Sequence, residues 1–371
     1  MDVGKLHRVC DLIVGEYQSK KIIELWAQCV STLQQAISNP GNPDLAKAYT
    51  DQYAALRASA EQSIYKRVQP TDKLIFEKLQ SEKFIGAGLV NKFDEIVAAN
   101  RFTLAVAIPQ LTAFQDEMQK YFNFVNGMLA GFKNLNIERD RIEFGQAEIG
   151  FYIPRELFSS ELTGFAKEIR QIDLLLRAFN ELTNNNQEKL ELRKISTSSW
   201  EIFVLASVAV IKGVNWVLKQ IVEMLRSLVD IKTQWEKLVK AGLPAETTDP
   251  LKNYIDSHID KKSRVIAEAA VAEFAKEVGQ DRKNELTNQL DQAIKFLASK
   301  LDGGVQIDLR ISIPPPAKGD ANSPEVQEKE RLRAELTDLS VQALETTNVV
   351  RELSQQSSGQ LKLSSPDLEK R

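Results

Sequence analysis

Apolar residues repeat in alternating steps of four and three along three long segments, and this spacing constrains the fold most. The cleanest repeat has no exception and consists of Phe158, Leu162, Phe165, Ile169, Ile172, Leu176 and Phe179. A second repeat runs from Val217 to Leu238 and extends backward to Phe203. Such spacing is typical of helices packed as coiled coils. The sequence therefore predicts a mainly α protein, an elongated antiparallel helical bundle or coiled coil.

The third repeat runs from Leu111 to Phe132 and has a polar residue, Gln115, in one apolar position. A polar side chain at such a position can determine helix register or the number of partners. Gln115 is therefore the candidate register-setting polar core residue. A four-three repeat can equally pack within one chain, so an intermolecular zipper is only one of its two uses.

Turn residues and caps predict where several helices begin and end. Pro40-Gly41-Asn42-Pro43 separates two amphipathic stretches, which predicts an α-hairpin in the first part of the chain. Ser198-Ser199-Trp200-Glu201 fits a capping box at the start of a long helix from Phe203 to Leu238. Asp249-Pro250 has the residues expected to open the next helix.

Three short segments do not follow the helical spacing. Val305 to Ile313 alternates strictly between apolar and polar residues, which is typical of a half-buried strand. Glu148 to Ile153 and Leu190 to Ile195 are weaker strand candidates. The sequence thus predicts a small β element of two or three short strands, without indicating which of them pair.

Composition changes along the chain predict three parts. Residues 1–100 are expected to form a helical hairpin and short helices, and residues 101–316 the long coiled-coil helices with the small strand element. The triple proline Pro314–Pro316 predicts an extended linker. Residues 317–371 would then hold a linker, a charged helix and a disordered tail, and removal of Asp320 to Arg371 should leave the remaining body folded.

Composition and motifs argue against several kinds of site. Lys and Arg total 48 against 51 Asp and Glu, so the net charge of −3 gives no field that would concentrate nucleic acid. His7 and His258 are the two histidines, which leaves no pair at helical spacing for zinc. Gly86 and Gly88 lack the third glycine of a dinucleotide fingerprint. No catalytic, metal or cofactor-binding residue is assigned, and no cofactor is expected.

The N-terminal residues do not read as a signal peptide, because they run straight into an amphipathic pattern without a continuous apolar stretch. A cytoplasmic location is therefore expected. Cys10 and Cys29 lie too far apart for a disulfide if they share one helix, so both are expected to be buried thiols.

The run from Ile202 to Ile211 is apolar on all sides. Ten residues are too few to span a bilayer, which needs about twenty, so a buried core helix is the first interpretation. The alternative is a segment that is released into a membrane or a partner groove. Its candidate contact residues are Trp200, Phe203, Val204, Leu205, Val208 and Trp216.

Three functions remain open on these observations. The first is a non-enzymatic scaffold or partner-binding protein that binds a protein partner, or itself, through its helical faces. The second is a membrane-active protein that releases residues 202–211, and its overall plan resembles that of α-helical pore-forming toxins. The third is an enzyme with a site made of carboxylates alone, which would leave little trace in the spacing of residues.

Overall fold

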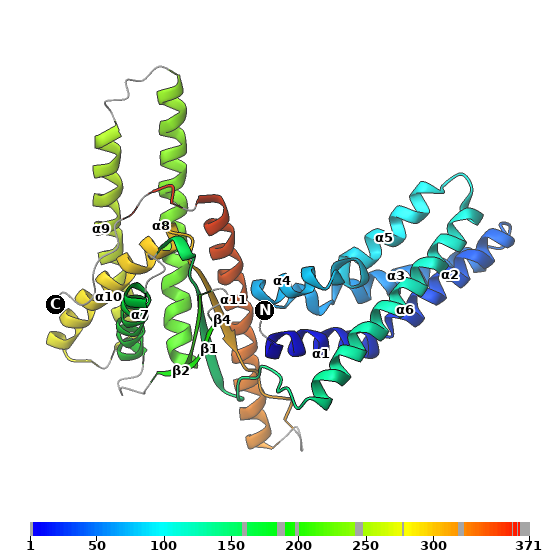
Figure 1. Ribbon diagram of the computed structural model, residues 1–371, viewed down its shortest axis with the longest axis horizontal. Coiled ribbons are helices and arrows are strands. Elements are labelled where there is room, and N and C mark those ends of the chain that lie inside the picture. The colour runs from blue at the N-terminus through cyan, green and yellow to red at the C-terminus, as the bar shows by residue number, and fades with distance from the viewer. Residues whose placement is uncertain are drawn as a thin grey trace. The chain divides into compact units, whose positions relative to one another are not determined.

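The structure is a computed structural model that describes residues 3–157, 162–183, 190–196, 200–241, 248–276, 278–317, 323–357, 359–361 and 363. Contacts divide the chain into two compact units, Met1–Arg141 and Ile142–Arg371, each with its own hydrophobic core (Figure 1). The sequence predicts boundaries near residues 100 and 316 instead. Residues 101–141 thus belong with the first unit, and residues 317–371 belong to the second.

The first unit, unit 1, contains helices and no strand among its described residues. Its α-helices are α1 (Val3–Lys20), α2 (Ile22–Ser38), α3 (Pro43–Glu61), α4 (Pro70–Lys78), α5 (Gly86–Ala99) and α6 (Leu104–Asn134). The predicted stop at residues 40–43 is confirmed, because Asn42 caps α3 by accepting a hydrogen bond from the Asp44 backbone N–H at 3.0 Å. The first predicted helix is interrupted at Lys21, which has a left-handed φ of 50°.

Aromatic side chains from α2, α5 and α6 form the centre of the unit 1 core. Trp26 Nε1 donates to the Leu111 carbonyl at 3.0 Å, and the Trp26 ring packs on Phe93 and Phe114. Phe114 is buried, whereas Gln115 is partly exposed. The prediction that Gln115 is a polar core residue is therefore wrong, because Phe114 occupies the core position in this turn of α6. Both cysteines are buried, and burial raises the pKa of the thiols, to about 11 for Cys10 and about 12 for Cys29.

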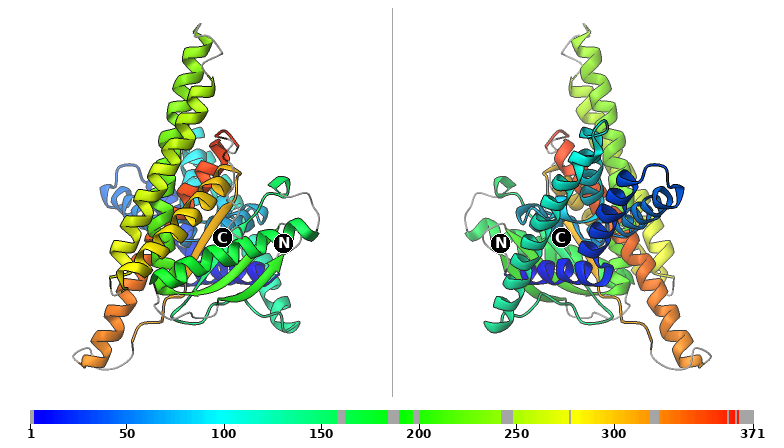
Figure 2. Two further views of the ribbon diagram at one scale, coloured as in Figure 1. Left: turned by 90° about the vertical axis from the view of Figure 1, so that its left-hand side faces the viewer. Right: turned by 90° about the vertical axis from the view of Figure 1, so that its right-hand side faces the viewer.

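The second unit, unit 2, combines helices with one four-stranded antiparallel sheet. Its helices are α7 (Leu162–Thr183), α8 (Val208–Lys240), α9 (Thr248–Phe274), α10 (Gln280–Asp302) and α11 (Pro324–Ser357). Its strands are β1 (Gln146–Tyr152), β2 (Glu191–Ser196), β3 (Glu201–Ser207) and β4 (Gln306–Ile311), in the order β2-β3-β1-β4. The mainly α fold and the three predicted strands are confirmed. α8 and α9 run side by side as a long pair (Figure 2).

The fourth strand, β3, corrects the prediction of one long helix from Phe203. The apolar run divides at Ser207, whose Oγ accepts a hydrogen bond from the Val210 backbone N–H at 3.4 Å and caps α8. Ser198 and Ser199, in the predicted capping box, lie outside the described residues. The run contains β-branched residues, which suit a strand, and both faces of β3 carry buried apolar side chains. The sequence of β3 therefore lacks the alternation of apolar and polar residues by which a strand is usually recognised.

One face of the sheet belongs to the unit 2 core. The register places apolar residues of three strands on this face: Ala147, Ile149, Phe151, Ile202, Val204, Ala206, Ile307, Leu309 and Ile311. They share one buried cluster with side chains of α7, α8 and α10, and α8 contacts β1, β3 and β4. Burial of this face joins the sheet to the helices.

α11 packs against β4, which is one edge of the sheet. The Leu309 backbone N–H donates to Thr347 Oγ1 at 3.3 Å, and Arg226 of α8 pairs with Glu352 at 3.4 Å. Beyond the helix, Asp302 accepts the backbone N–H groups of Leu361 and Leu363 at 3.1 and 3.2 Å. The charged helix is therefore a layer of unit 2, which argues against a tail that can be removed without cost.

We expect Thr347→Val to lower the free energy of unfolding by about 1–2 kcal/mol, because it leaves the buried Leu309 N–H without its acceptor. Thr337→Val is the matched control, since Thr337 is exposed and donates only within its own helix to the Arg333 carbonyl. Urea unfolding of both variants measures the difference. Equal stabilities would contradict the role given to α11.

Candidate functional site

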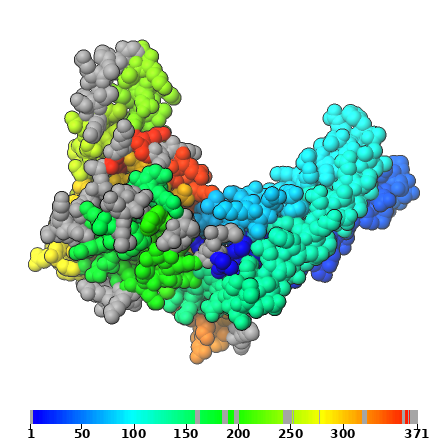
Figure 3. Space-filling view, in the orientation of Figure 1, coloured from blue at the N-terminus to red at the C-terminus, as the bar shows by residue number. Residues whose placement is uncertain are grey.

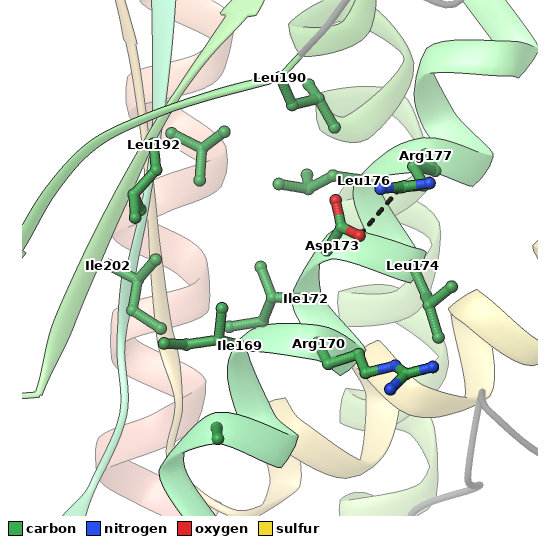
Figure 4. Close-up of a pocket in the computed structure, with 12 residues that line it drawn as sticks. Ile169, Arg170, Ile172, Asp173, Leu174, Leu176, Arg177, Leu190, Leu192 and Ile202 are labelled. Carbon is green, nitrogen blue, oxygen red and sulfur yellow. Dashed lines mark ion pairs between the residues drawn. The ribbon is translucent and has the colours of Figure 1, made fainter.

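The candidate site is an apolar hollow between α7 and the strands β2 and β3, with a volume of about 550 Å³ (Figure 4). We call it the α7–β2 hollow. It is lined by Ala166, Ile169, Arg170, Ile172, Asp173, Leu174, Leu176, Arg177, Leu190, Leu192, Ile202 and Val204. Figure 4 shows Leu190, Leu192 and Ile202 on the strand side, across the hollow from Ile172 and Leu176 of α7.

α7 is held in place by contacts on its other sides. Lys300 of α10 donates to Glu168 at 2.6 Å in a mostly buried ion pair, and Arg282 of α10 pairs with Glu181. The predicted four-three repeat of this helix supplies core residues, among them Ile172 and Phe179, which are buried. The position of α7 is therefore set by α8 and α10, and its packing leaves a gap toward the strands.

β2 forms the second edge of the sheet and carries apolar side chains beside the hollow. Among the described residues no strand pairs with its outer side. The Leu192 side chain is 51% exposed, and Ile195 is also exposed. The pairing of β2 with β3 shifts register between Leu192 and Lys194, which is a β-bulge at Arg193.

The bulge places Arg193 on the sheet face opposite the hollow. There Arg193 pairs with the buried Glu148 of β1, whose second oxygen lies 3.7 Å from Arg310 of β4. This ion pair ties the edge strand to the strand beyond β3. Burial lowers the pKa of Lys194, the next residue of β2, and nearby Glu201 opposes that shift. Charge on β2 is thus directed away from the hollow.

Charged groups of the hollow lie on α7. Asp173 and Arg177 form an ion pair of 2.9 Å, drawn as a dashed line in Figure 4, and both are substantially exposed. The Arg170 guanidinium points away from the strands. Asp173 supplies the one carboxylate among the described lining residues. Paired acid/base chemistry needs two titratable groups that converge, so this arrangement suits the binding of apolar groups better.

Of the six predicted contact residues, Val204 lines the hollow. Phe203 and Leu205 lie on the opposite face of β3. Trp200 packs on Phe165 with 4.5 Å between ring centroids, Trp216 contacts Phe274, and Val208 packs on the unit 2 core. These side chains thus share a sequence neighbourhood without forming one surface.

Sequence reasoning missed most of the lining, because the hollow joins two elements that are not neighbours in sequence. The repeat of α7 and the strand at residues 190–195 were both predicted, and they contribute Ile169, Leu176, Leu190 and Leu192. The sequence pattern does not indicate the order of the strands in the sheet. Knowing that β2 lies at an edge would have placed its apolar residues beside α7.

The structure places the apolar run 202–211 partly in a strand and partly in a helix, and not in one buried helix. Its first half is a central strand paired on both sides, and its second half begins α8. Release of the run would break the pairing of β3 with β1 and β2 together. No helix in the described parts of the chain has the length and apolarity to cross a membrane.

Phe203 packs over Gly150, its direct neighbour on β1, and its ring meets Tyr152 edge-on at 5.6 Å. A Cβ at Gly150 would lie 2.8 Å from Phe203 Cε1. We expect Gly150→Ala to cost about 1–3 kcal/mol of unfolding free energy through this overlap. The double variant that also carries Phe203→Leu should lose less unfolding free energy than the two single variants together. Urea unfolding measures the three losses, and strictly additive losses would show that the contact between Gly150 and Phe203 is unimportant.

In comparisons with known proteins, no family model, curated protein or solved structure matched this chain. A role for the chain is therefore inferred from the geometry of the α7–β2 hollow and its charges.

Proposed function

We propose that this chain is a non-catalytic protein that binds an extended, apolar segment of a protein partner at the α7–β2 hollow. The observation that carries the proposal is the combination of an apolar hollow with an edge strand beside it. Extended peptides bind at such places by adding a strand, so that backbone hydrogen bonds give affinity and pockets for alternate side chains give specificity.

The size and lining of the hollow support this mode of binding. About 550 Å³ lies within the range of roughly 300–1,000 Å³ typical of ligand pockets, which accommodates several apolar side chains. Leu192 gains most from being covered, because about half of its side chain is exposed. A partner segment along β2 would bring every second side chain to the mouth of the hollow.

The bulge at Arg193 supports a short, specific contact. Bulges and charged residues on edge strands oppose pairing with long or unrelated strands, and β2 also carries Glu191 and Lys194. Leu190 and Leu192 precede the bulge and line the hollow. A segment of a few residues could pair there, whereas a long strand would meet the distorted part of β2.

The helical repeats give less support to binding through coiled-coil faces. The buried residues of α6, from Leu111 to Leu129, lie within the unit 1 core, and those of α7 lie within the unit 2 core. Repeats used inside each unit are not available to a partner. A partner-binding role therefore depends on the hollow rather than on the helical repeats.

Selection from a random peptide library displayed on phage tests the proposal without a known partner. The parent protein should enrich peptides with alternating apolar residues. Leu192→Glu should weaken binding of the selected peptides about tenfold or more, because it places a carboxylate against the apolar hollow. Leu332→Glu on α11 is the matched control, since Leu332 is also 51% exposed.

Comparing the two variants distinguishes a specific effect at the α7–β2 hollow from the general effect of removing an exposed apolar side chain. Equal binding by the parent and both variants, or no enrichment by the parent, would count against the α7–β2 hollow as a peptide site. Circular dichroism and urea unfolding of each variant verify that the fold is retained.

A further inference from the structure

Two segments of unit 1 are almost free of charged residues in a chain of which 27% is charged. No Asp, Glu, Lys or Arg occurs between Glu24 and Asp44, and between Glu95 and Asp116 Arg101 is the single one. The first segment holds most of α2 and the turn before α3. The second holds the turn between α5 and α6 and the part of α6 up to Gln115.

The fold brings these two segments together at one end of unit 1. α2 packs on α6, and the hydrogen bond from Trp26 to the Leu111 carbonyl joins the two segments directly. α1 precedes α2 and meets the later part of α6, where Tyr17 stacks on Phe122, so the chain direction of α1–α2 opposes that of α6. The turns after α2 and after α5 consequently lie at the same end of unit 1, as the ribbon shows (Figure 1).

This end of unit 1 carries the most exposed large apolar side chain among the described residues. Phe102, in the turn between α5 and α6, is 87% exposed, and Val106 in the first turns of α6 is also exposed. The Arg101 guanidinium lies over the Phe102 ring, 4.6 Å from its centroid. In the space-filling view the cyan turn between α5 and α6 projects at one corner of this end, beside the blue end of α2 (Figure 3). We call residues 101–106 the aromatic tip.

We propose that the aromatic tip binds the surface of an anionic lipid bilayer. Moving a charged side chain toward a bilayer is costly, and the two segments that meet at this end contain no charged residue except Arg101 of the tip itself. An exposed aromatic ring beside a cation is the combination that binds at the boundary between lipid headgroups and acyl chains. The positive charge of Arg101 complements acidic headgroups.

The charges nearest to Arg101 in sequence, Asp94 and Glu95 of α5, each have a partner on unit 1: Asp94 accepts from Tyr53, and Glu95 pairs with Lys92. α3 follows the other uncharged turn with Asp44 and Lys47, which balance one another, so Arg101 is the one charge that the aromatic tip itself presents. The exposed residues of α2 nearby are polar but uncharged, among them Gln34, Gln35 and Ser38. These residues suit contact at the headgroup level rather than deep insertion. The proposed contact is thus peripheral and involves unit 1 alone, independently of the α7–β2 hollow and of residues 202–211.

Flotation of the full chain with lipid vesicles tests the proposal. The parent should float with vesicles of phosphatidylcholine and phosphatidylserine, and much less with phosphatidylcholine alone. Phe102→Ser should weaken the apparent affinity for the vesicles about tenfold or more, which corresponds to losing the burial of one aromatic side chain. Phe124→Ser is the matched control, because Phe124 is 58% exposed on α6 itself but lies outside the uncharged segments. Arg101→Gln should abolish the preference for acidic vesicles.

Three results would overturn the proposal. One is a parent protein that does not float with acidic vesicles, which would leave a protein partner as the occupant of this end. Another is an equal loss for Phe102→Ser and Phe124→Ser, which would indicate nonspecific adsorption. The third is equal flotation with neutral and acidic vesicles, which would remove the role of Arg101. Because both phenylalanines are exposed, unfolding curves should match the parent and confirm that the variants fold.

Discussion

The pairing of β3 with β1 is the interaction on which unit 2 depends. It runs without interruption from Gln146 opposite Ser207 to Tyr152 opposite Glu201, and it places Val204 and Ile149 side by side in the core. β1 and β3 occupy the centre of the sheet, so β2 and β4 are held through them. The face they share is the surface on which α8 packs. Loss of this pairing would remove the support for the hollow as well.

The two edge strands of the sheet have different neighbours, and this difference produces the candidate site. At β4, α11 lies along the edge and Thr347 accepts the Leu309 N–H. At β2, a bulge and an ion pair from Arg193 to Glu148 hold the strand, and an apolar hollow remains beside α7. Edge strands left without a covering element attract further strands. The described residues cover one edge of the sheet and not the other, and the proposed peptide site follows from this difference.

The sequence predicted the elements whose apolar residues follow a clear period. Helices with one apolar face and the alternating strand at residues 306–311 have a visible period. β3 was missed because both of its faces carry apolar residues, and an apolar run without alternation fits a buried helix equally well. Phe114 and Gln115 are adjacent, so a shift of one position in the repeat exchanged a core residue for a surface one. The hollow needed the strand order, which no local pattern encodes.

The central claim is that the sheet has one closed and one open edge, and amide hydrogen exchange resolved to single residues tests it most directly. The account predicts that the amides of β3 and the Leu309 amide of β4 exchange only through global unfolding. The β2 amides that do not donate to β3 should exchange faster by orders of magnitude in the free protein. Exchange of those β2 amides as slow as that of Leu309 would contradict the account, because it would mean that the edge beside the hollow is already closed.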